Sequence, residues 1–236
     1  MNYVRSQYFG CDENLTWYTV VMTQQTGLRQ RKKQQTAQAL WAAAIGLFLE
    51  HGFENVTVAQ IAAAVDVSRM TVFNYFPTKE DLALHPVEAH VGDAARIVRE
   101  RPAGQPPVEA LRRAFLTGLA ERDAATGLSD APNVLAVRRL LRDTPSLAHR
   151  ALRLVARDRE LLDAELAGPD TEPDVLARVA AAQLVGVREE LIAENVRRLL
   201  DGENADAVHP EARAAAEAAF TMAAHGLHRF PGRGED

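Results

Sequence analysis

Five side chains between residues 69 and 75 have the chemistry needed to contact a nucleic acid: Arg69, Met70, Thr71, Asn74 and Tyr75. A guanidinium can donate two parallel hydrogen bonds to a guanine edge, and thioether or methyl groups can contact a thymine methyl. A tyrosine hydroxyl can donate to a phosphate. This chemistry is recognition rather than catalysis, and it requires one exposed helix face that carries the whole set.

The preceding residues predict the first part of an element that would present this face. Residues 57–65 indicate a short helix that opens with a capping box, in which Thr57 and Gln60 satisfy each other's backbone N–H groups. Apolar residues recur at positions i, i+3, i+4 and i+7, which gives the helix one buried face. These residues are Val58, Ile61, Ala62 and Val65.

A second short helix is expected directly afterwards. Asp66 holds a tight turn, and Ser68 caps the new helix. Val72, Phe73 and Phe76 are expected to face inward, which leaves the five recognition side chains facing outward. Two short helices around a tight turn form a helix-turn-helix, and a helix of this size fits the major groove of DNA.

The flanking segments extend the motif into a domain. Upstream, an amphipathic helix ends at Gly52, a left-handed cap, and Phe53 packs back on that helix. Downstream, Thr78 begins another capped helix. With these flanks, residues 47–53 and 73–82 closely resemble the TetR family of one-component regulators.

That resemblance implies a DNA-binding domain over residues 29–94 and assigns contacts within it. Residues near base edges would be Arg69, Met70, Thr71 and Asn74, and residues near phosphates would be Thr57, Val58, Ser68, Tyr75 and Lys79. Lys79 also lies in the first turn of its helix, where free N–H groups attract an anion. The family usually has glycine in the turn, whereas Asp66 tolerates the left-handed conformation at some cost. The alternative is that these are ordinary exposed helix residues.

Positive charge gathers at the same end of the chain. Residues 28–79 carry six basic and three acidic residues, a net +3 in a chain whose formal charge is −5. A localised basic patch is typical of nucleic-acid binding. The basic run before the first helix, Arg29, Arg31, Lys32 and Lys33, could be an arm that lies along phosphates or in the minor groove. The alternative is a solvated, disordered lead-in.

Composition and length limit what kinds of domain the rest of the 236 residues can form. No apolar run approaches the length of a membrane span, and a single cysteine, Cys11, excludes an internal disulfide, so we expect a cytoplasmic protein without membrane contact. Residues 1–28 are interpreted as a disordered or over-called extension and residues 231–236 as a tail. Residues 95–230 are long enough for a helical effector-binding and dimerisation domain with its own core.

Prolines and glycines at the expected starts and ends predict a series of helices and no strand, so the expected fold class is all-α. The helices are expected over residues 78–100, with a break near Pro86, and then over 107–122, 132–143, 145–167, 173–201 and 210–229. The last five each begin at a proline, which suits the first turn of a helix because its missing N–H has no helical partner there.

Catalytic and metal motifs are absent from the sequence. There is no phosphate-binding glycine loop, His-Glu-x-x-His or nucleophile elbow, so we expect no enzyme, no cofactor and no metal. His225 and His228 extend a polar stripe and are interpreted as part of a solvated face. The acidic loop 170–174 lacks the calcium-loop pattern.

Aromatic residues are scarce beyond residue 77, where the only ones are Phe115, Phe220 and Phe230. A pocket there would be lined by Leu, Val and Ala, which suits a flexible aliphatic ligand better than a flat aromatic one. The alternative is a filled aliphatic core. The lead-in 27–33 and the helical body also resemble the acyl-CoA-responsive branch of the family, which implies acyl-CoA as an effector.

Two stripes of small residues on the last two helices predict self-association. They are Val179, Ala182 and Gly186 on the first helix and Ala216, Ala219 and Ala223 on the second. The resemblance implies that these helices pair into a four-helix bundle, and a two-fold pairing is the commonest way to bury such a surface. The alternative is that both stripes pack inside one chain.

These features predict a homodimeric repressor that binds double-stranded operator DNA and is released by a small apolar effector. Two other classes stay open. A nucleoid-associated or partner-binding protein could use the same DNA-binding domain with a filled body, and no effector would then alter its DNA binding. An enzyme with an appended DNA-binding domain would bring titratable residues together in a cleft.

Overall fold

Helices make up the regular structure of the described residues. The computed structural model describes residues 28–168 and 171–226, and the side chains from residue 31 onward. The expectations for the N-terminal extension, for Cys11, for His228 and for the tail lie outside this range. Within it the fold is all-α, as the sequence predicts, and none of these helices is long and apolar enough to cross a membrane.

The chain divides into two compact units, residues 1–38 and 39–236. The first unit is described from residue 28, where α2 (Leu28–His51) begins. The basic run at residues 31–33 is therefore helical, so it is not a disordered lead-in before the first helix. Contact of these basic residues with phosphates stays a prediction. The physical reason is that this stretch has no helix breaker and consists of Arg, Gln and Lys, which are good helix formers.

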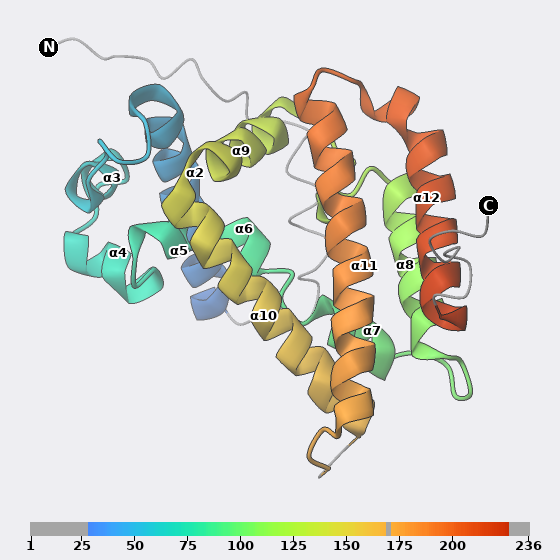
Figure 1. The fold of residues 1–236 in the computed structure, drawn as a ribbon. Helices are drawn as coiled ribbons and strands as arrows, with labels where there is room; N and C mark the ends of the chain where they lie inside the picture. The colour runs from blue at the N-terminus through green and yellow to red at the C-terminus, as the bar shows by residue number, and fades with distance from the viewer. Residues whose placement is uncertain (1–27, 169–170, 227–236) are drawn as a thin grey trace, which may run out of the picture. The chain divides into compact units, whose positions relative to one another are not determined.

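The second unit begins within α2 and contains the helix-turn-helix. After Gly52 (φ +82°) come α3 (Val58–Ala64) and α4 (Arg69–Tyr75), which lie next to each other (Figure 1). Their shared core consists of Leu40, Ala44, Phe48, Phe53, Ile61, Val72 and Phe76, all buried. The Phe48 and Phe53 rings are 4.9 Å apart, which confirms that Phe53 packs back on the preceding helix.

Three short helices follow where one broken helix was expected. They are α5 (Lys79–Ala83), α6 (His85–Glu88) and α7 (Asp93–Arg99). The break before Pro86 confirms the prediction, but a second break at Gly92 (φ +92°) was not predicted. The Gly92 N–H donates to Asp158 Oδ1 at 2.7 Å, so a tertiary contact replaces the helical hydrogen bond there.

The remaining helices form the body of the second unit. They are α8 (Pro107–Ala120), the 3-10 turn η2 (Ala124–Thr126), α9 (Pro132–Asp143), α10 (Pro145–Ala167), α11 (Val175–Leu200) and α12 (Ala205–His225). α12 packs against α8 and α11, and α10 packs against α7 and α11 (Figure 1). The predicted bounds of α9 and α10 are confirmed.

The last two helices begin at other residues than predicted. α12 begins at Ala205 because the Asn204 side chain accepts a hydrogen bond from the N–H of Ala207, at 2.8 Å. Pro210 therefore lies inside α12 instead of opening it, and its missing N–H removes one helical bond near the exposed N-terminal end. α11 begins two residues after Pro173, because Asp174 caps it.

Candidate nucleic-acid interface

The frame of the helix-turn-helix is held by local hydrogen bonds. The N–H of Thr57 donates to Gln60 Oε1 at 2.8 Å, and the N–H of Gln60 donates to Thr57 Oγ1 at 3.3 Å, which confirms the capping box. Ser68 Oγ accepts from the N–H of Thr71 at 3.0 Å and caps α4. Asp66 adopts φ +55°, so the turn forms without glycine. These bonds fix the starts of both helices.

One side of α4 is available to a partner. Arg69 and Asn74 are exposed and Met70 is 68% exposed, whereas Thr71 and Tyr75 are partly buried. The inward position predicted for Phe73 is wrong, because that ring is 46% exposed. Val72 and Phe76, four residues apart, fill the buried side of the helix. Phe73 follows Val72 and therefore points about 100° away from that side. The exposed face therefore combines polar groups with an aromatic ring.

The residues predicted near phosphates lie in different environments. Thr57 and Ser68 are exposed but use their hydroxyl oxygens as helix caps, and Val58 is partly buried. In the first unit, Arg31, Lys32 and Lys33 are all exposed on successive positions of α2. Three neighbouring positions of a helix point in three directions, so the basic side chains spread around α2 rather than forming one stripe.

Lys79 makes contacts that the sequence does not reveal. Its Nζ donates to the carbonyl oxygen of Phe53 at 2.7 Å and to that of Val56 at 3.2 Å. The same ammonium lies 4.2 Å from the centre of the Phe53 ring, within the range of a cation–π interaction. Lys79 lies more than twenty residues from both partners in the sequence, so no local sequence pattern predicts these contacts.

Two polar links connect α5 and the segment before α7 to the body. Arg150 on α10 forms an ion pair with Asp81 on α5, with Nη2 and Oδ1 2.6 Å apart. Asp158 on α10 accepts the N–H of Gly92 and also pairs with Arg188 on α11 at 3.2 Å. The bonds from α10 to Asp81 and to Gly92 each join residues nearly seventy positions apart, and sequence reasoning missed them for that reason. They attach the segment that follows the helix-turn-helix to two long helices of the body.

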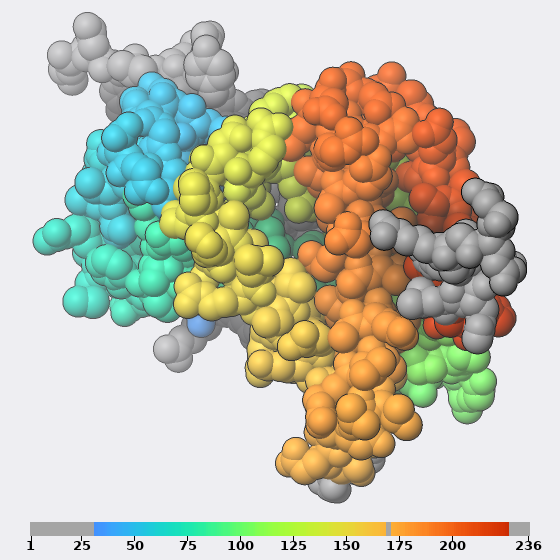
Figure 2. All heavy atoms as spheres, in the orientation of Figure 1, coloured from blue at the N-terminus to red at the C-terminus, as the bar shows by residue number. Residues whose placement is uncertain are grey.

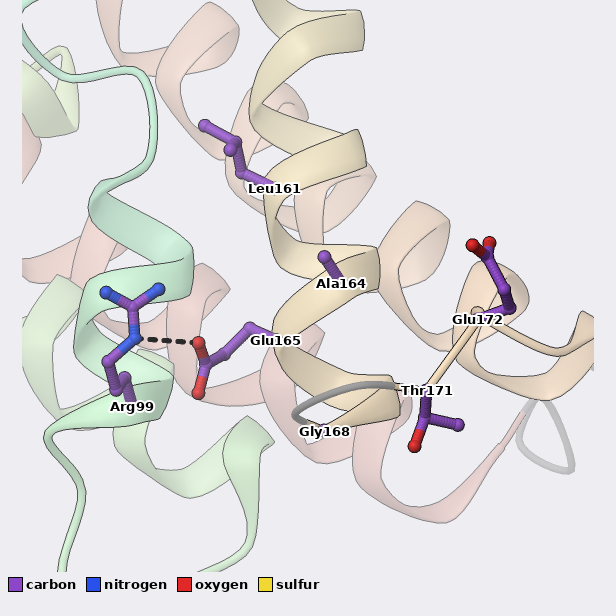
Figure 3. A pocket seen from close by; sticks show the side chains of 7 residues that line it. All are labelled: Arg99, Leu161, Ala164, Glu165, Gly168, Thr171 and Glu172. Carbon is purple, nitrogen blue, oxygen red and sulfur yellow. Dashed lines mark hydrogen bonds and ion pairs between the residues drawn. The ribbon is translucent and has the colours of Figure 1, made fainter.

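A groove of about 760 Å³ lies at the far end of α10 (Figure 3). Its lining residues are Arg99, Leu161, Ala164, Glu165, Gly168, Thr171 and Glu172. In Figure 3 the Arg99 guanidinium faces the Glu165 carboxylate, to which Nε donates at 2.8 Å. The Arg99–Glu165 ion pair and the Glu172 carboxylate along its wall do not suit the apolar ligand that the composition predicts.

The small-residue stripes differ between the two helices. Val179, Ala182 and Gly186 are exposed, and the outer side of α11 lies at the surface of the second unit (Figure 2). Ala216 is fully buried in the core around Phe220, so its predicted place in a dimer interface is wrong. Its side chain packs inside the chain because α12 turns this side toward α8 and α11. Ala219 and Ala223 are partly buried against the same core.

No cluster of three or more potential metal ligands is found among the described residues. Of the predicted polar stripe, His225 is exposed, and its Nδ1 lies 2.9 Å from the carbonyl oxygen of Thr221 in the preceding turn of the same helix. This arrangement is that of a helix surface.

These elements define an all-helical protein with a helix-turn-helix DNA-binding domain. Residues 40–85 match the family described as bacterial regulatory proteins of the tetR family. The chain is 40% identical, over 128 residues, to the HTH-type transcriptional regulator TcmR of Streptomyces glaucescens. The resemblance to this family therefore lies in the helix-turn-helix domain. The match to TcmR covers 54% of this chain and 57% of that protein.

Solved structures share the helical architecture. NalD of Pseudomonas aeruginosa, the secondary repressor of the MexAB-OprM multidrug efflux pump, is 19% identical with a TM-score of 0.53, over 80% of this chain and 96% of that one. At this identity the similarity shows the fold alone. FadR of Thermus thermophilus in complex with lauroyl-CoA is 22% identical with a TM-score of 0.48, over 85% and 99% of the two chains.

Proposed function

We propose that this chain is a sequence-specific transcriptional regulator, a repressor that a small apolar effector releases from operator DNA. The observation that carries the proposal is the exposed face of α4, where Arg69, Met70 and Asn74 project from a helix whose start is fixed by Ser68. A rigid helix that presents a guanidinium, a thioether and a carboxamide matches the hydrogen-bonding and methyl groups of a major groove.

The proposed contacts to base edges are those of Arg69, Met70, Thr71 and Asn74. The test is selection of bound duplexes from a random library, followed by competition between the selected duplex and a scrambled one. A regulator of this kind binds its own site about 10³-fold or more tighter than unrelated DNA. Equal affinity for the two duplexes would exclude sequence-specific regulation.

Dimer formation is part of the proposal because one helix-turn-helix reads only half a site. Two readout helices about 34–36 Å apart can enter successive major grooves on one side of the duplex. Val179, Ala182 and Gly186 support a pairing surface on α11, because they are small or apolar, exposed and spaced three or four residues apart. Small side chains permit close approach of a second copy of the same helix.

The proposed effector has a flexible aliphatic chain, and a long-chain acyl-CoA is the first candidate. Support comes from the two described aromatics of the body, Phe115 and Phe220, whose rings pack 5.9 Å apart inside the core. They contribute to the core itself, so a pocket nearby would be lined mainly by aliphatic groups.

A panel of acyl-CoAs of increasing chain length tests the effector. A ligand acts only through its different affinity for the two conformations, so an effector should lower operator affinity and raise the melting temperature of the free protein. If no member of the panel changes either quantity, the acyl effector is wrong, and a DNA-binding protein without a small ligand becomes the better account.

A further inference from the structure

The ammonium group of Lys79 is committed to the protein's own backbone. An ammonium has three N–H donors, and here two of them point at the carbonyl oxygens of Phe53 and Val56. The Phe53 ring lies beneath the same group at 4.2 Å. Lys79 is partly buried, so these contacts are less screened by water than those of a fully exposed lysine.

The two carbonyl groups belong to the turn that connects α2 to α3. The side chains of Phe53 and Val56 are 4% and 1% exposed, so both residues are anchored in the domain core. Val56 directly precedes Thr57, whose side chain caps α3. A force that holds the carbonyl of residue 56 therefore also sets where the helix-turn-helix begins.

We propose that Lys79 is a positioning residue of the DNA-binding domain, whose ammonium holds the turn at residues 53–56 and thereby fixes the start of α3. The sequence suggested a different role, a direct contact from Lys79 to a DNA phosphate. A phosphate would have to compete with two carbonyls and an aromatic face for the same ammonium group. Hydrogen bonds with a charged donor are roughly twice as strong as neutral ones, so the two carbonyls hold the ammonium against the turn in the free domain.

The two roles differ in their dependence on salt. Each phosphate neutralised by a lysine contributes about 0.9 to the slope of log affinity against log salt. A positioning residue contributes nothing to that slope, although its loss weakens binding. Only the salt-dependence measurement rests on the proposed DNA binding, because the order of the turn at residues 53–56 can be measured in the free protein.

The test uses Lys79→Met in the full chain, with Lys79→Arg as the conservative variant and the exposed Lys33→Met as the control for loss of one lysine charge. In hydrogen exchange of the free protein, Lys79→Met should speed exchange in residues 53–62 and leave residues 107–120 unchanged. Lys79→Arg, which can still donate to both carbonyls, should retain most of the protection, and Lys33→Met should retain all of it.

In binding to the selected duplex, Lys79→Met should lose about tenfold in affinity, the equivalent of about one charged hydrogen bond, with a salt slope equal to that of the wild type. Unchanged exchange in residues 53–62 would overturn the proposal, and so would a slope reduced by about one. If the wild type binds no duplex, the proposed function fails, and the exchange experiment still decides whether Lys79 holds the turn.

Discussion

Arg150 and Asp81 form an ion pair that joins α10 to α5, with the guanidinium nitrogen 2.6 Å from the carboxylate oxygen. The Asp81 side chain is 9% exposed and the Arg150 side chain 32%. Asp81 lies two residues after Lys79, which holds the turn before α3. One short helix therefore contacts the body at one residue and the turn before α3 at another.

Loss of this ion pair should destabilise the fold. Arg150→Met leaves a buried carboxylate without its charged partner, and we expect a loss of about 1–3 kcal/mol, between the values for exposed and fully buried pairs. Adding Asp81→Asn to this variant should recover part of the lost stability, because the unpaired carboxylate is then gone. Urea denaturation of the single and double variants measures both changes in the free energy of unfolding. The control is Arg157→Met, which breaks an exposed pair with Glu160 and should change stability by less than about 0.5 kcal/mol. Equal losses in Arg150→Met and the control would contradict the account.

Replacing Arg69 tests the readout helix. Arg69→Ala removes an exposed guanidinium without disturbing the Ser68 cap, so we expect unchanged stability, a loss of about 1–3 kcal/mol in operator binding and relaxed preference at one base pair. Binding to duplexes substituted at each position in turn measures the effect. If the variant keeps the wild-type ratio of specific to random binding, Arg69 reads no base.

A negative charge on α11 should prevent dimer formation without unfolding the chain. Ala182 is exposed, so Ala182→Glu should fold normally but place unpaired charges in the pairing surface, and sedimentation should find monomers with weak operator affinity. Ala216 is fully buried, so Ala216→Glu should lower the melting temperature instead. A dimeric Ala182→Glu variant with full operator affinity would show that the interface lies elsewhere.

Acid should destabilise the protein through His85. Burial lowers the pKa of His85 below its ordinary value of 6.5, and its ring lies edge-on to Phe76 at 5.1 Å. The unfolded chain therefore binds this proton more readily than the folded one. The contribution to stability is complete above pH 6.5 and is lost as the pH falls toward the folded-state pKa.

The melting temperature measured between pH 7.5 and 5 should show this loss. His85→Gln should weaken its pH dependence, whereas His149→Gln, at an exposed position of α10, serves as the control. An identical pH dependence in the wild type and His85→Gln would rule out His85 as the source.

Local rules were sufficient for the DNA-binding domain. The capping box at Thr57, the left-handed turn at Asp66 and the cap at Gly52 depend on residues within a few positions, and each was predicted from the sequence and confirmed. Phe73 was placed wrongly because adjacent apolar residues compete for one buried face, and periodicity alone does not decide which one loses.

Long-range contacts account for what the sequence could not predict. The bonds from Lys79 to residues 53 and 56, and that from Arg150 to Asp81, join distant segments and depend on the packed structure. Ala216 illustrates the same limit, because a stripe of small residues fits a protomer core as well as a dimer interface. The sequence predicts a helix start at Pro210, whereas the Asn204 side chain caps a helix that begins at Ala205.

If the exposed face of α4 reads DNA sequence as part of a dimer, selection from a random duplex library with the full chain should enrich an inverted repeat. We expect its half-sites to be centred one helical turn, about 34–36 Å, apart, and we expect the enrichment to be lost in Arg69→Ala. Recovery of unenriched sequences by the wild type, or of the same repeat by the variant, would contradict this expectation.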